Sequence, residues 1–387
     1  MKLETLAIHG GHIPDAGSGA VAKPITLSVT YQRESDGTYP KGSFYSSKGN
    51  PNRDTLEACF AGLERGHTAV AFSSGCAAIT AVIRAALKPG DQVLVPDDLF
   101  QGTVRILRDV MPKWGITYRM IDMTDLRAAA AALTPQTKLV WTETFSNPLL
   151  KVTDLRAVAK IAHQAGAVCV VDNSFVTPAL QRPLDFGVDL VVHASTKYVG
   201  GHGDVLGGIV VSKENSSLIH DVRQIQLLEG AVPAPFDCWL THRGLKTLPY
   251  RVRAHSANAM AVARHLYGHR WVKKVFYPGL ESHEGHELAA GQLNDGFGGI
   301  VSLQVRGGRD AAVRAAGYVK IFINATSFGE VESLIQHQAT SPTHGSGTGI
   351  HDDLLRLSVG LEHPDDLISD LDQALTRAHE SARDKTA

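Results

Sequence analysis

Between residues 53 and 246 the chain alternates short apolar runs with longer amphipathic segments, and this pattern limits the folds that it can adopt. Seven runs resemble strands, at 68–75, 91–98, 117–122, 137–144, 167–175, 189–195 and 207–212. Helical segments separate most of them, at 52–66, 76–90, 101–115, 125–134 and 154–166. Continuously apolar strands that alternate with helices are typical of a mostly parallel sheet covered on both faces. The sequence therefore predicts an α/β fold.

The segments on either side have a different character. Residues 1–52 are rich in Gly, Pro and Ser and contain one strand-like run, 23–32, so we expect an ordered arm that packs on another surface, such as a neighbouring subunit. After residue 246 come a helix at 250–269, strands at 300–308, 321–328 and 354–362, and an amphipathic helix at 365–382. We predict an arm at 1–52, a large domain at 53–246 and a smaller C-terminal α+β domain at 247–387.

Composition excludes several classes of partner. The 387 residues are 43% hydrophobic and 20% charged, with a formal net charge of −1. Because no basic run stands out, nucleic acid and anionic membrane are poor candidate partners. The N-terminus has no apolar core of signal-peptide length and no stretch reaches transmembrane length, so we expect a cytoplasmic protein. None of the four cysteines forms a C-x-x-C pair and H-E-x-x-H does not occur, so we predict no dedicated metal site.

Three segments place unusual residues just beyond predicted strands, where ligands bind in a doubly wound sheet. Ser74, Gly75 and Cys76 form a turn into a helix, whose free N–H groups and dipole suit a phosphate, although an ordinary Ser N-cap is the alternative. Asp172 ends one apolar run and Lys197 follows another; the alternative for each is a solvated loop residue. No G-x-G-x-x-G follows the first strand, which disfavours a dinucleotide.

A phosphate-binding turn, a carboxylate and a lysine together suit pyridoxal phosphate. This cofactor needs an amine that holds its aldehyde, an anion that keeps its ring nitrogen protonated, and N–H and hydroxyl donors for its phosphate. Lys197 and Asp172 would then contact opposite sides of one ring, and the glycines after Lys197 allow the backbone to approach closely.

The chain also resembles the Cys/Met-metabolism family of pyridoxal-phosphate enzymes, which includes cystathionine γ-synthase, the cystathionine lyases and methionine γ-lyase. The motifs that carry the resemblance run along almost the whole chain: "YSSKGNPNRDTLE", "SSGCAAI", "ETFSNPLLKVTDL", "VVDNSFVTPALQRPL", "HASTKYVGGHGDV", "PFDCWLTHRGLKTL", "VESLIQH" and "LLRLSVGLEHPDDLISDL". The resemblance implies an aspartate-aminotransferase-like fold and a homo-oligomer, with a tetramer as the expected form.

The resemblance also implies a role for individual residues. Lys197 becomes the Schiff-base lysine and proton carrier, and Asp172 the partner of the ring nitrogen. Tyr45 reaches in from a neighbouring subunit as a catalytic and cofactor-binding residue. The remaining cofactor contacts are assigned to Ser74, Gly75, Cys76, Phe100, Ser195 and Thr196. The substrate contacts are assigned to Asn147, Ser327, Glu330 and Arg356, with Arg356 holding the carboxylate through a bidentate fork.

The chain departs from the family pattern at four places. Ser47 stands where an arginine usually binds the phosphate, and Ala194 stands where a serine usually precedes the lysine, with Ser195 beside it. Phe100 replaces the tyrosine that stacks on the ring, and a phenylalanine cannot transfer a proton. Glu330 replaces a glycine, while Thr326 stands where members that handle cystathionine often have an acid.

These observations favour γ-elimination or γ-replacement on a homoserine-type amino acid. Because Phe100 removes a proton donor, we expect an oxygen-linked γ-substituent to be preferred. Glu330 favours a cationic one, such as the oxyguanidine group of canavanine, although this carboxylate facing water is the alternative. Cystathionine and methionine remain open as substrates. The sequence also leaves open β-elimination, as in cystathionine β-lyase, and a catalytically silent member of the family.

Overall fold

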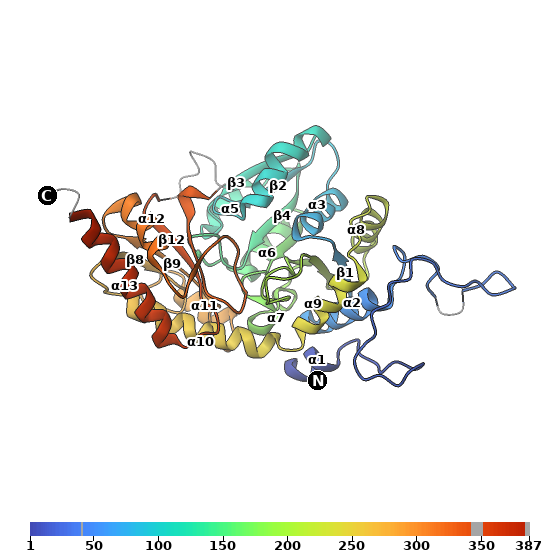
Figure 1. Cartoon of the computed structure of the whole chain (residues 1–387). Helices are drawn as coiled ribbons and strands as arrows, with labels where there is room; N and C mark the ends of the chain where they lie inside the picture. The colour runs from blue at the N-terminus through green and yellow to red at the C-terminus, as the bar shows by residue number, and fades with distance from the viewer. Residues whose placement is uncertain (40–41, 342–350, 384–387) are drawn as a thin grey trace.

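The computed structural model describes residues 1–39, 42–341 and 351–383, which form two sheet domains and an arm (Figure 1). The larger sheet has seven strands in the order β1-β7-β6-β5-β4-β2-β3. Their bounds are β1 Thr68–Phe72, β2 Gln92–Pro96, β3 Thr117–Ile121, β4 Thr137–Glu143, β5 Val168–Asp172, β6 Leu190–His193 and β7 Gly208–Ser212. The strands from β3 to β6 are parallel, and β7 is antiparallel to β1 and β6. This confirms the predicted mostly parallel α/β sheet.

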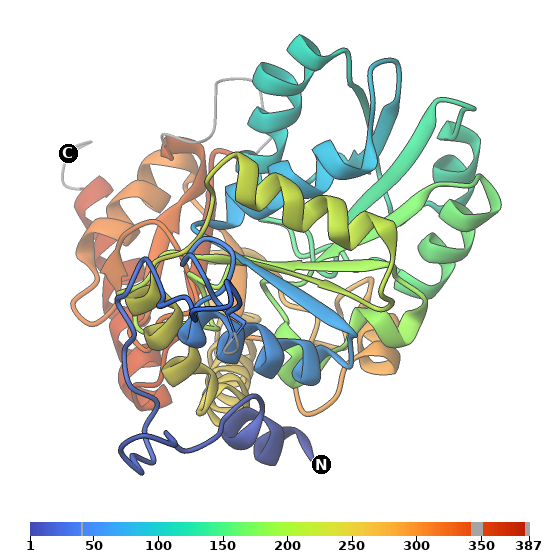
Figure 2. The same cartoon turned by 90° about the vertical axis from the view of Figure 1, so that its right-hand side faces the viewer.

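Alternate side chains of each strand enter two separate hydrophobic cores, as the two-residue period of a strand requires. Val70 and Phe72 of β1 join the core beneath α3 (Gly75–Ala86) and α8 (Ser217–Leu228). Ala69 and Ala71 join the core beneath α2 (Pro51–Glu64) and α6 (Leu155–Gln164). Figure 2 shows α8 and α2 on opposite faces of the sheet. Apart from the exposed edge strand β3, polar groups of this sheet therefore reach solvent mainly at the strand ends.

The smaller sheet lies in the C-terminal part of the chain, in the order β10-β11-β12-β9-β8. Its strands are β8 Val272–Phe276, β9 Ile300–Val305, β10 Ile323–Asn324, β11 Leu334–His337 and β12 Leu354–Ser358. Three helices share its hydrophobic core: α10 Leu248–Leu266, α12 Gly308–Tyr318 and α13 Pro364–Arg383. The remaining α-helices are α1 Leu3–His9, α4 Gln101–Arg105, α5 Leu126–Ala132, α7 Thr177–Leu180, α9 Pro235–Leu245 and α11 His286–Gln292. The predicted C-terminal α+β architecture is confirmed, whereas the domain boundaries stay predictions.

Some predicted elements were wrong or too long. The run 23–32 is not a strand, and its contact is an isolated bridge between Thr30 and Tyr45. The predicted strand at 321–328 is reduced to β10, because its pairing with β11 covers only two residues. The predicted helix at 101–115 changes from α4 to a π-helical turn at Ile106–Val110 and a 3-10 turn at Met111–Trp114, where Pro112 lacks a backbone donor.

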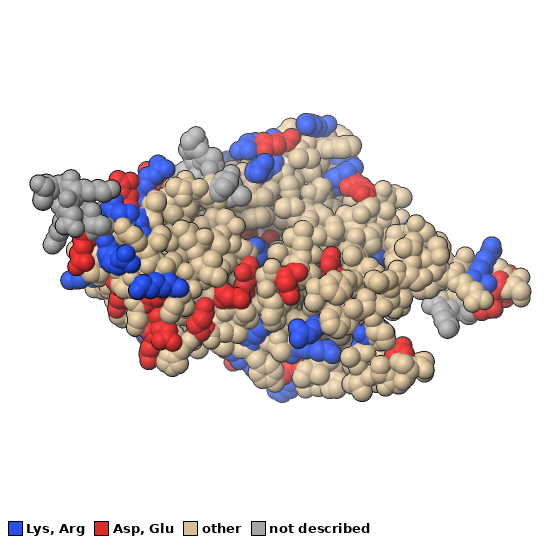
Figure 3. Space-filling model, in the orientation of Figure 1, with Lys and Arg blue, Asp and Glu red and all other residues tan. Residues whose placement is uncertain are grey.

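Charged residues of both signs are interspersed on the face shown in Figure 3, in keeping with the near-zero net charge. Within the described ranges, no helix combines the length and apolar character that a membrane span needs. The cytoplasmic location stays a prediction.

Several buried or half-buried side chains anchor the arm to the body of its own chain, among them Asn50 and Asn52, which hydrogen-bond the backbone of Pro24 and Thr26. Arg53 of α2 is 1% exposed, and its guanidinium donates to the carbonyl oxygens of Ser46 (2.9 Å) and Ser47 (3.1 Å). The Trp239 indole of α9 donates to the carbonyl oxygen of Lys23 at 2.8 Å. Between these anchors the arm projects away from the body (Figure 1).

We predict that Arg53→Met releases the base of the arm, because two hydrogen bonds from a charged donor are lost, each worth about 1.5–3 kcal/mol. Limited chymotrypsin digestion should cleave the variant after Phe44 or Tyr45 faster than the unmodified protein. Lys48→Met is the matched control, since Lys48 is exposed and near the same turn. Equal cleavage rates in all three proteins would show that Arg53 does not hold the arm.

Candidate active site

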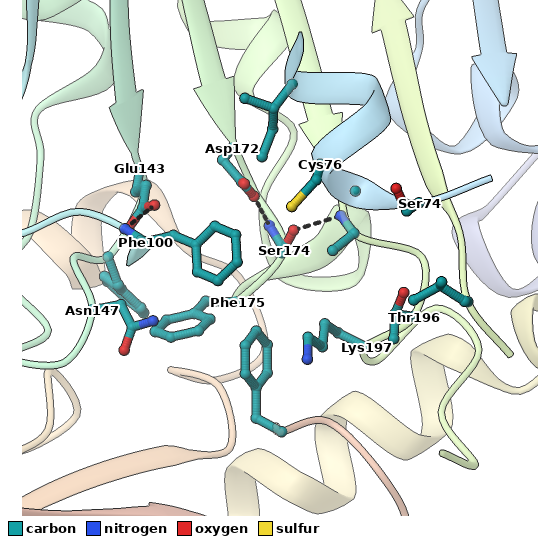
Figure 4. Close-up of a pocket in the computed structure, with 16 residues that line it drawn as sticks. Ser74, Cys76, Phe100, Glu143, Asn147, Asp172, Ser174, Phe175, Thr196 and Lys197 are labelled. Atoms are coloured by element: carbon teal, nitrogen blue, oxygen red, sulfur yellow. Dashed lines mark hydrogen bonds between the residues drawn. The ribbon is translucent and has the colours of Figure 1, made fainter. Parts of the chain in front are cut away.

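A cavity of about 360 Å³ opens at the carboxyl edge of the large sheet. Side chains from the ends of β4 and β5, the start of α3 and the loop around Lys197 line it (Figure 4). The C-terminal domain contributes Phe328. The lining comprises Ser74, Gly75, Cys76, Ile79, Phe100, Glu143, Phe145, Asn147, Asp172, Ser174, Phe175, Ala194, Thr196, Lys197, Leu206 and Phe328.

The start of α3 forms a cradle of backbone donors at one end of the cavity. Ser74 is the N-cap, and its Oγ accepts the N–H of Ala77 at 3.1 Å. The N–H groups of Gly75 and Cys76 belong to the first turn and have no intrahelical acceptor, so they are suited to an anion. A Cβ on Gly208 would lie 2.4 Å from the Ser74 carbonyl oxygen, so only glycine lets β7 pass this turn so closely.

Asp172 is the last residue of β5 and lines the cavity. Its Oδ1 accepts the N–H of Ser174 at 3.0 Å, and the Ser174 Oγ accepts the N–H of Ala194 at 2.7 Å. Burial raises the pKa of Asp172, while the Ser174 hydrogen bonds and the nearby His193 oppose this rise. The carboxylate is thus fixed in place and would be stabilised by a cationic group in the cavity.

Lys197 enters the cavity from the loop after β6, on another side from Asp172 (Figure 4). Its Nζ donates to Ser327 Oγ at 2.7 Å and lies 4.9 Å from the centre of the Phe328 ring. Burial, followed by the charge of Arg356, lowers the pKa of Lys197 to about 8, against the weaker opposing effect of Glu330. A substantial fraction of the amine is therefore neutral near physiological pH, as a nucleophile or base requires.

The glycines after Lys197 are explained by two close side chains. A Cβ on Gly201 (φ +77°) would lie 2.0 Å from the Arg251 guanidinium. Arg251 is buried and donates to the carbonyl oxygens of Tyr198 (2.7 Å) and Gly244 (2.8 Å), which fixes the loop beside the lysine. A Cβ on Gly203 (φ +66°) would lie 3.0 Å from the Glu330 carboxylate.

Arg356 of β12 is buried beside the cavity and is held by neutral oxygens. Its guanidinium donates to Asn147 Oδ1 (3.0 Å), the Ser327 carbonyl oxygen (2.9 Å) and Gln336 Oε1 (2.9 Å). Burial lowers its pKa to about 10, so it stays charged at neutral pH. No carboxylate pairs with it within the described residues. A buried cation without an anion is suited to a substrate carboxylate.

Four phenylalanines make most of the cavity wall apolar: Phe100, Phe145, Phe175 and Phe328. Phe175 meets Phe328 edge-on with ring centres 4.5 Å apart, and the Arg356 guanidinium lies 5.6 Å from the Phe328 ring centre. The Phe328 ring thus lies near both the Lys197 amine and the Arg356 guanidinium.

Comparison with known proteins agrees with this geometry. The family model described as "Cys/Met metabolism PLP-dependent enzyme" matches residues 4–376. The chain belongs to this family. It is therefore a pyridoxal-phosphate (PLP)-dependent enzyme, of the type that its γ-synthase and lyase relatives represent.

Individual relatives are similar over nearly their whole length. Cystathionine gamma-synthase of Mycobacterium tuberculosis is 48% identical over 374 residues, covering 96% of each chain. Cystathionine gamma-lyase of Dictyostelium discoideum is 41% identical over 382 residues, covering 97% of this chain and 98% of the relative. The solved structure of metB from Corynebacterium glutamicum has a TM-score of 0.95 at 40% identity, covering 97% of this chain and 98% of that one. The predicted family and fold are confirmed.

The residues of the cavity fit PLP of this family. The α3 cradle and Thr196 would hold the phosphate, Asp172 the ring nitrogen and Lys197 the aldehyde carbon, with Phe100 against the ring. PLP needs three kinds of group, and all three line this cavity: free N–H groups at the start of α3, the buried acid Asp172, and Lys197 with its lowered pKa.

Several predicted site residues lie outside the cavity lining. Ser195 is not part of this lining and instead lines a smaller cavity near Gly207; its placement does not support a phosphate contact. Ser327 and Arg356 border the cavity through their contacts with Lys197 and Asn147. Glu330 lies against Gly203, which is not part of the lining. Tyr45 lies in the arm, 46% exposed, and does not line the cavity of its own chain.

Two histidines, His265 and His269, meet Asp372 in the C-terminal domain. His265 Nε2 lies 2.7 Å and His269 Nε2 3.3 Å from Asp372 Oδ1. His269 Nδ1 accepts the N–H of Trp271 at 3.2 Å, which leaves the proton of a neutral ring on Nε2. That nitrogen therefore has no free lone pair for a metal, and we interpret the cluster as a link between α10 and α13.

We predict that Lys197 of the apoenzyme reacts with acetic anhydride with an apparent pKa near 8, because burial disfavours the ammonium form. Below this pH the labelling rate should rise about tenfold per pH unit, and above it the rate should level off. Competitive labelling with mass spectrometry would measure this profile, with the exposed lysines of the same digest as internal reference. A plateau reached only above pH 10 would contradict the assignment.

Proposed function

We propose that the enzyme catalyses γ-elimination or γ-replacement on a homoserine-type amino acid whose γ-substituent is linked through oxygen, with cationic substituents as the preferred class. The preference for a cationic substituent is inferred from the Glu330 carboxylate, which lies against Gly203 and close enough to Lys197 to affect the pKa of Lys197. The reaction type, γ-elimination or γ-replacement, is inferred from the family and from the cystathionine gamma-synthase relatives.

An α-amino acid has a carboxylate that matches Arg356. The guanidinium is oriented by Asn147 and by the Ser327 carbonyl oxygen, and its burial strengthens any charge-assisted hydrogen bond that it makes. Ser327 adopts a positive φ of 95°, which places its carbonyl oxygen on Arg356 and its Oγ on Lys197. The backbone strain at Ser327 therefore links the carboxylate site with the reactive amine.

Lys197 is positioned to move protons at the substrate carbons. When bound, PLP supplies an electron sink that acidifies the Cα–H bond. With a pKa of about 8, Lys197 can remove the Cα proton and return a proton within one reaction cycle. Ser327 Oγ, its hydrogen-bond acceptor, fixes the direction of the amine.

The cavity wall offers few proton donors to a leaving group. Phe100 and Phe328 have no ionisable group, and Phe145 and Phe175 extend the same apolar surface. A γ-substituent that needs protonation as it departs is therefore disfavoured relative to an oxygen-linked group of low basicity. Thr326 adds no charge where cystathionine-handling relatives often have an acid. These features support an oxygen-linked substituent over cystathionine.

A flat cation suits the surroundings of Glu330. A guanidinium group can pair with a carboxylate through two hydrogen bonds and stack on aromatic rings. The half-buried Glu330 and the cavity phenylalanines supply both kinds of contact. The oxyguanidine end of canavanine combines this cation with an oxygen link to Cγ, so we propose it as the representative substrate.

We predict that Glu330→Gln lowers kcat/KM for canavanine by about tenfold to a hundredfold, the effect of one lost charge-assisted contact. O-acetylhomoserine, which is neutral at its γ-end, should change by less than about threefold. Initial rates of 2-oxobutanoate and ammonia formation would measure both. Glu332→Gln is the matched control, because it removes the same charge from an exposed position two residues away.

The outcomes separate the candidate reactions. Equal losses on both substrates in Glu330→Gln would refute charge recognition. Efficient cleavage of cystathionine by the unmodified enzyme would refute the leaving-group argument, and pyruvate in place of 2-oxobutanoate would indicate β-elimination, as in the Coxiella burnetii cystathionine beta-lyase relative. Bound PLP with no turnover on any substrate would indicate a catalytically silent member.

We further propose a homotetramer built from dimers that share their active sites. The arm exposes large apolar side chains that a second subunit would cover: Ile13, Val21, Leu27, Val29 and Phe44. Tyr45 is next to Phe44, is 46% exposed and does not line the cavity of its own chain, so we propose that it reaches the cavity of a neighbouring subunit.

We predict that inactive Tyr45→Ala and Lys197→Ala chains regain activity when they are mixed under conditions of subunit exchange. Each mixed dimer would contain one intact site, with Lys197 from one chain and Tyr45 from the other. Random pairing should therefore restore about a quarter of the unmodified activity. Absence of recovery, with exchange demonstrated by mass spectrometry, would exclude a shared site.

A further inference from the structure

Three buried or half-buried acids form a row at the carboxyl edge of the large sheet. The strands β5, β4 and β2 are neighbours, and Asp172 and Glu143 are the last residues of β5 and β4. Their Cα atoms are partners in the parallel register. Asp98 follows β2 by two residues. Glu143 is therefore the middle member of the row, and the reaction proposed above gives it no role.

The three acids differ in their partners. Asp98 accepts hydrogen bonds from the Ser146 hydroxyl and from the Leu149 N–H. Asp172 accepts a hydrogen bond from the Ser174 N–H, and in the family arrangement it faces the ring nitrogen of PLP. Glu143 is 6% exposed, and among the described residues its carboxyl group accepts one hydrogen bond, from the Phe100 N–H at 2.9 Å (Figure 4). Phe100 is the residue assigned to the face of the ring.

In the part of the chain that the structure describes, Glu143 has no cation as a direct partner. It lines the main cavity and also a small cavity on its other side. Lys151, the cation of that small cavity, is already bound by Asp97 (3.1 Å) and Asp122 (2.8 Å). The charged and titratable groups around Glu143 are Asp172 on β5, Asp97, Asp98, Asp122 and Lys151 around the small cavity, and Cys76 and Lys197 across the main cavity.

Two adjacent buried carboxylates repel each other strongly, so a row of this kind favours one shared proton. Asp172 is the acid expected to stay ionised, because in the holoenzyme a cationic ring nitrogen faces it and stabilises its negative charge. The pKa of Glu143 is raised well above its ordinary value, first by burial and then by the charge of Asp172. The position of Glu143 in the row and the charge of its neighbour therefore both favour a proton on Glu143.

We propose that Glu143 is a positioning residue that stays protonated in the resting enzyme. As a neutral acid its carbonyl oxygen anchors the backbone of Phe100, which fixes the aromatic ring at the cofactor. Its neutrality also leaves Asp172 as the negative charge beside the ring nitrogen, undisturbed by a second carboxylate. Because it concerns the resting enzyme with PLP, this role is independent of the substrate proposed above.

The infrared spectrum tests the protonation state directly. The holoenzyme at pH 7 should show the carbonyl-stretching band of a protonated carboxylic acid, and Glu143→Gln should lack that band. Asp98→Asn is the matched control, because it removes another acid of the row and should leave the band in place. A difference spectrum between the unmodified enzyme and Glu143→Gln that contains only carboxylate bands would overturn the proposal.

Cofactor affinity tests the positioning role separately. Glu143→Gln keeps a neutral oxygen for the Phe100 N–H, so its dissociation constant for PLP should stay within about threefold of the unmodified value. Glu143→Ala leaves that N–H without its partner and should weaken binding by about tenfold or more. Fluorescence titration of the apoenzymes would measure both. Equal weakening in the two variants would show that the charge of Glu143 is needed, and no weakening in either would show that Glu143 does not position Phe100.

Discussion

The buried Arg356 guanidinium, held by neutral oxygens alone among the described residues, is the charge around which the active site is arranged. A cation in such a place costs solvation energy, and the cost is offset when an anionic substrate binds. Its charge also contributes to the lowered pKa of Lys197. The Phe328 ring contacts both cations, with its centre 4.9 Å from the amine and 5.6 Å from the guanidinium carbon. One residue of the C-terminal domain therefore adjusts the reactivity of a lysine in the large domain and is also the proposed binding site of the substrate carboxylate.

The large sheet explains why the acids lie opposite these cations. Both of its faces are covered by helices, and the parallel strands β2, β4 and β5 end at the same edge. Polar residues at those ends meet in one place although they are far apart in sequence. The cavity is thus bounded by acids from the large sheet on one side and by cations near the domain contact on the other, an arrangement that suits a zwitterionic amino acid and a charged cofactor.

Much of this arrangement could be predicted from the sequence, because it follows from local pattern. The apolar runs predicted the sheet, and Asp172, Lys197 and the Ser74–Cys76 turn are marked by their positions at strand ends. Glu143 is also an acid at the end of an apolar strand, β4, so the criterion that identified Asp172 could have identified Glu143 from the sequence. The direction of Ser195 and the contact of Arg251 with Gly201 depend on the packing of distant segments, which no local pattern reveals. The strand expected at 23–32 failed because β-propensity alone, without a neighbouring strand, does not form a sheet.

The contact between Arg251 and the loop after Lys197 has a consequence for motion. Arg251 ties down the carbonyl oxygens of Tyr198 and Gly244, and Gly201 leaves no space between loop and guanidinium. The backbone that bears the lysine is therefore rigid, while the amine is carried on a flexible four-carbon stem. Displacement and recapture of the amine then require only side-chain rotations, which occur in picoseconds to nanoseconds in exposed residues and more slowly in packed ones. A loop that had to refold at each release would add a step on the microsecond scale or slower, and this packing makes that step unnecessary.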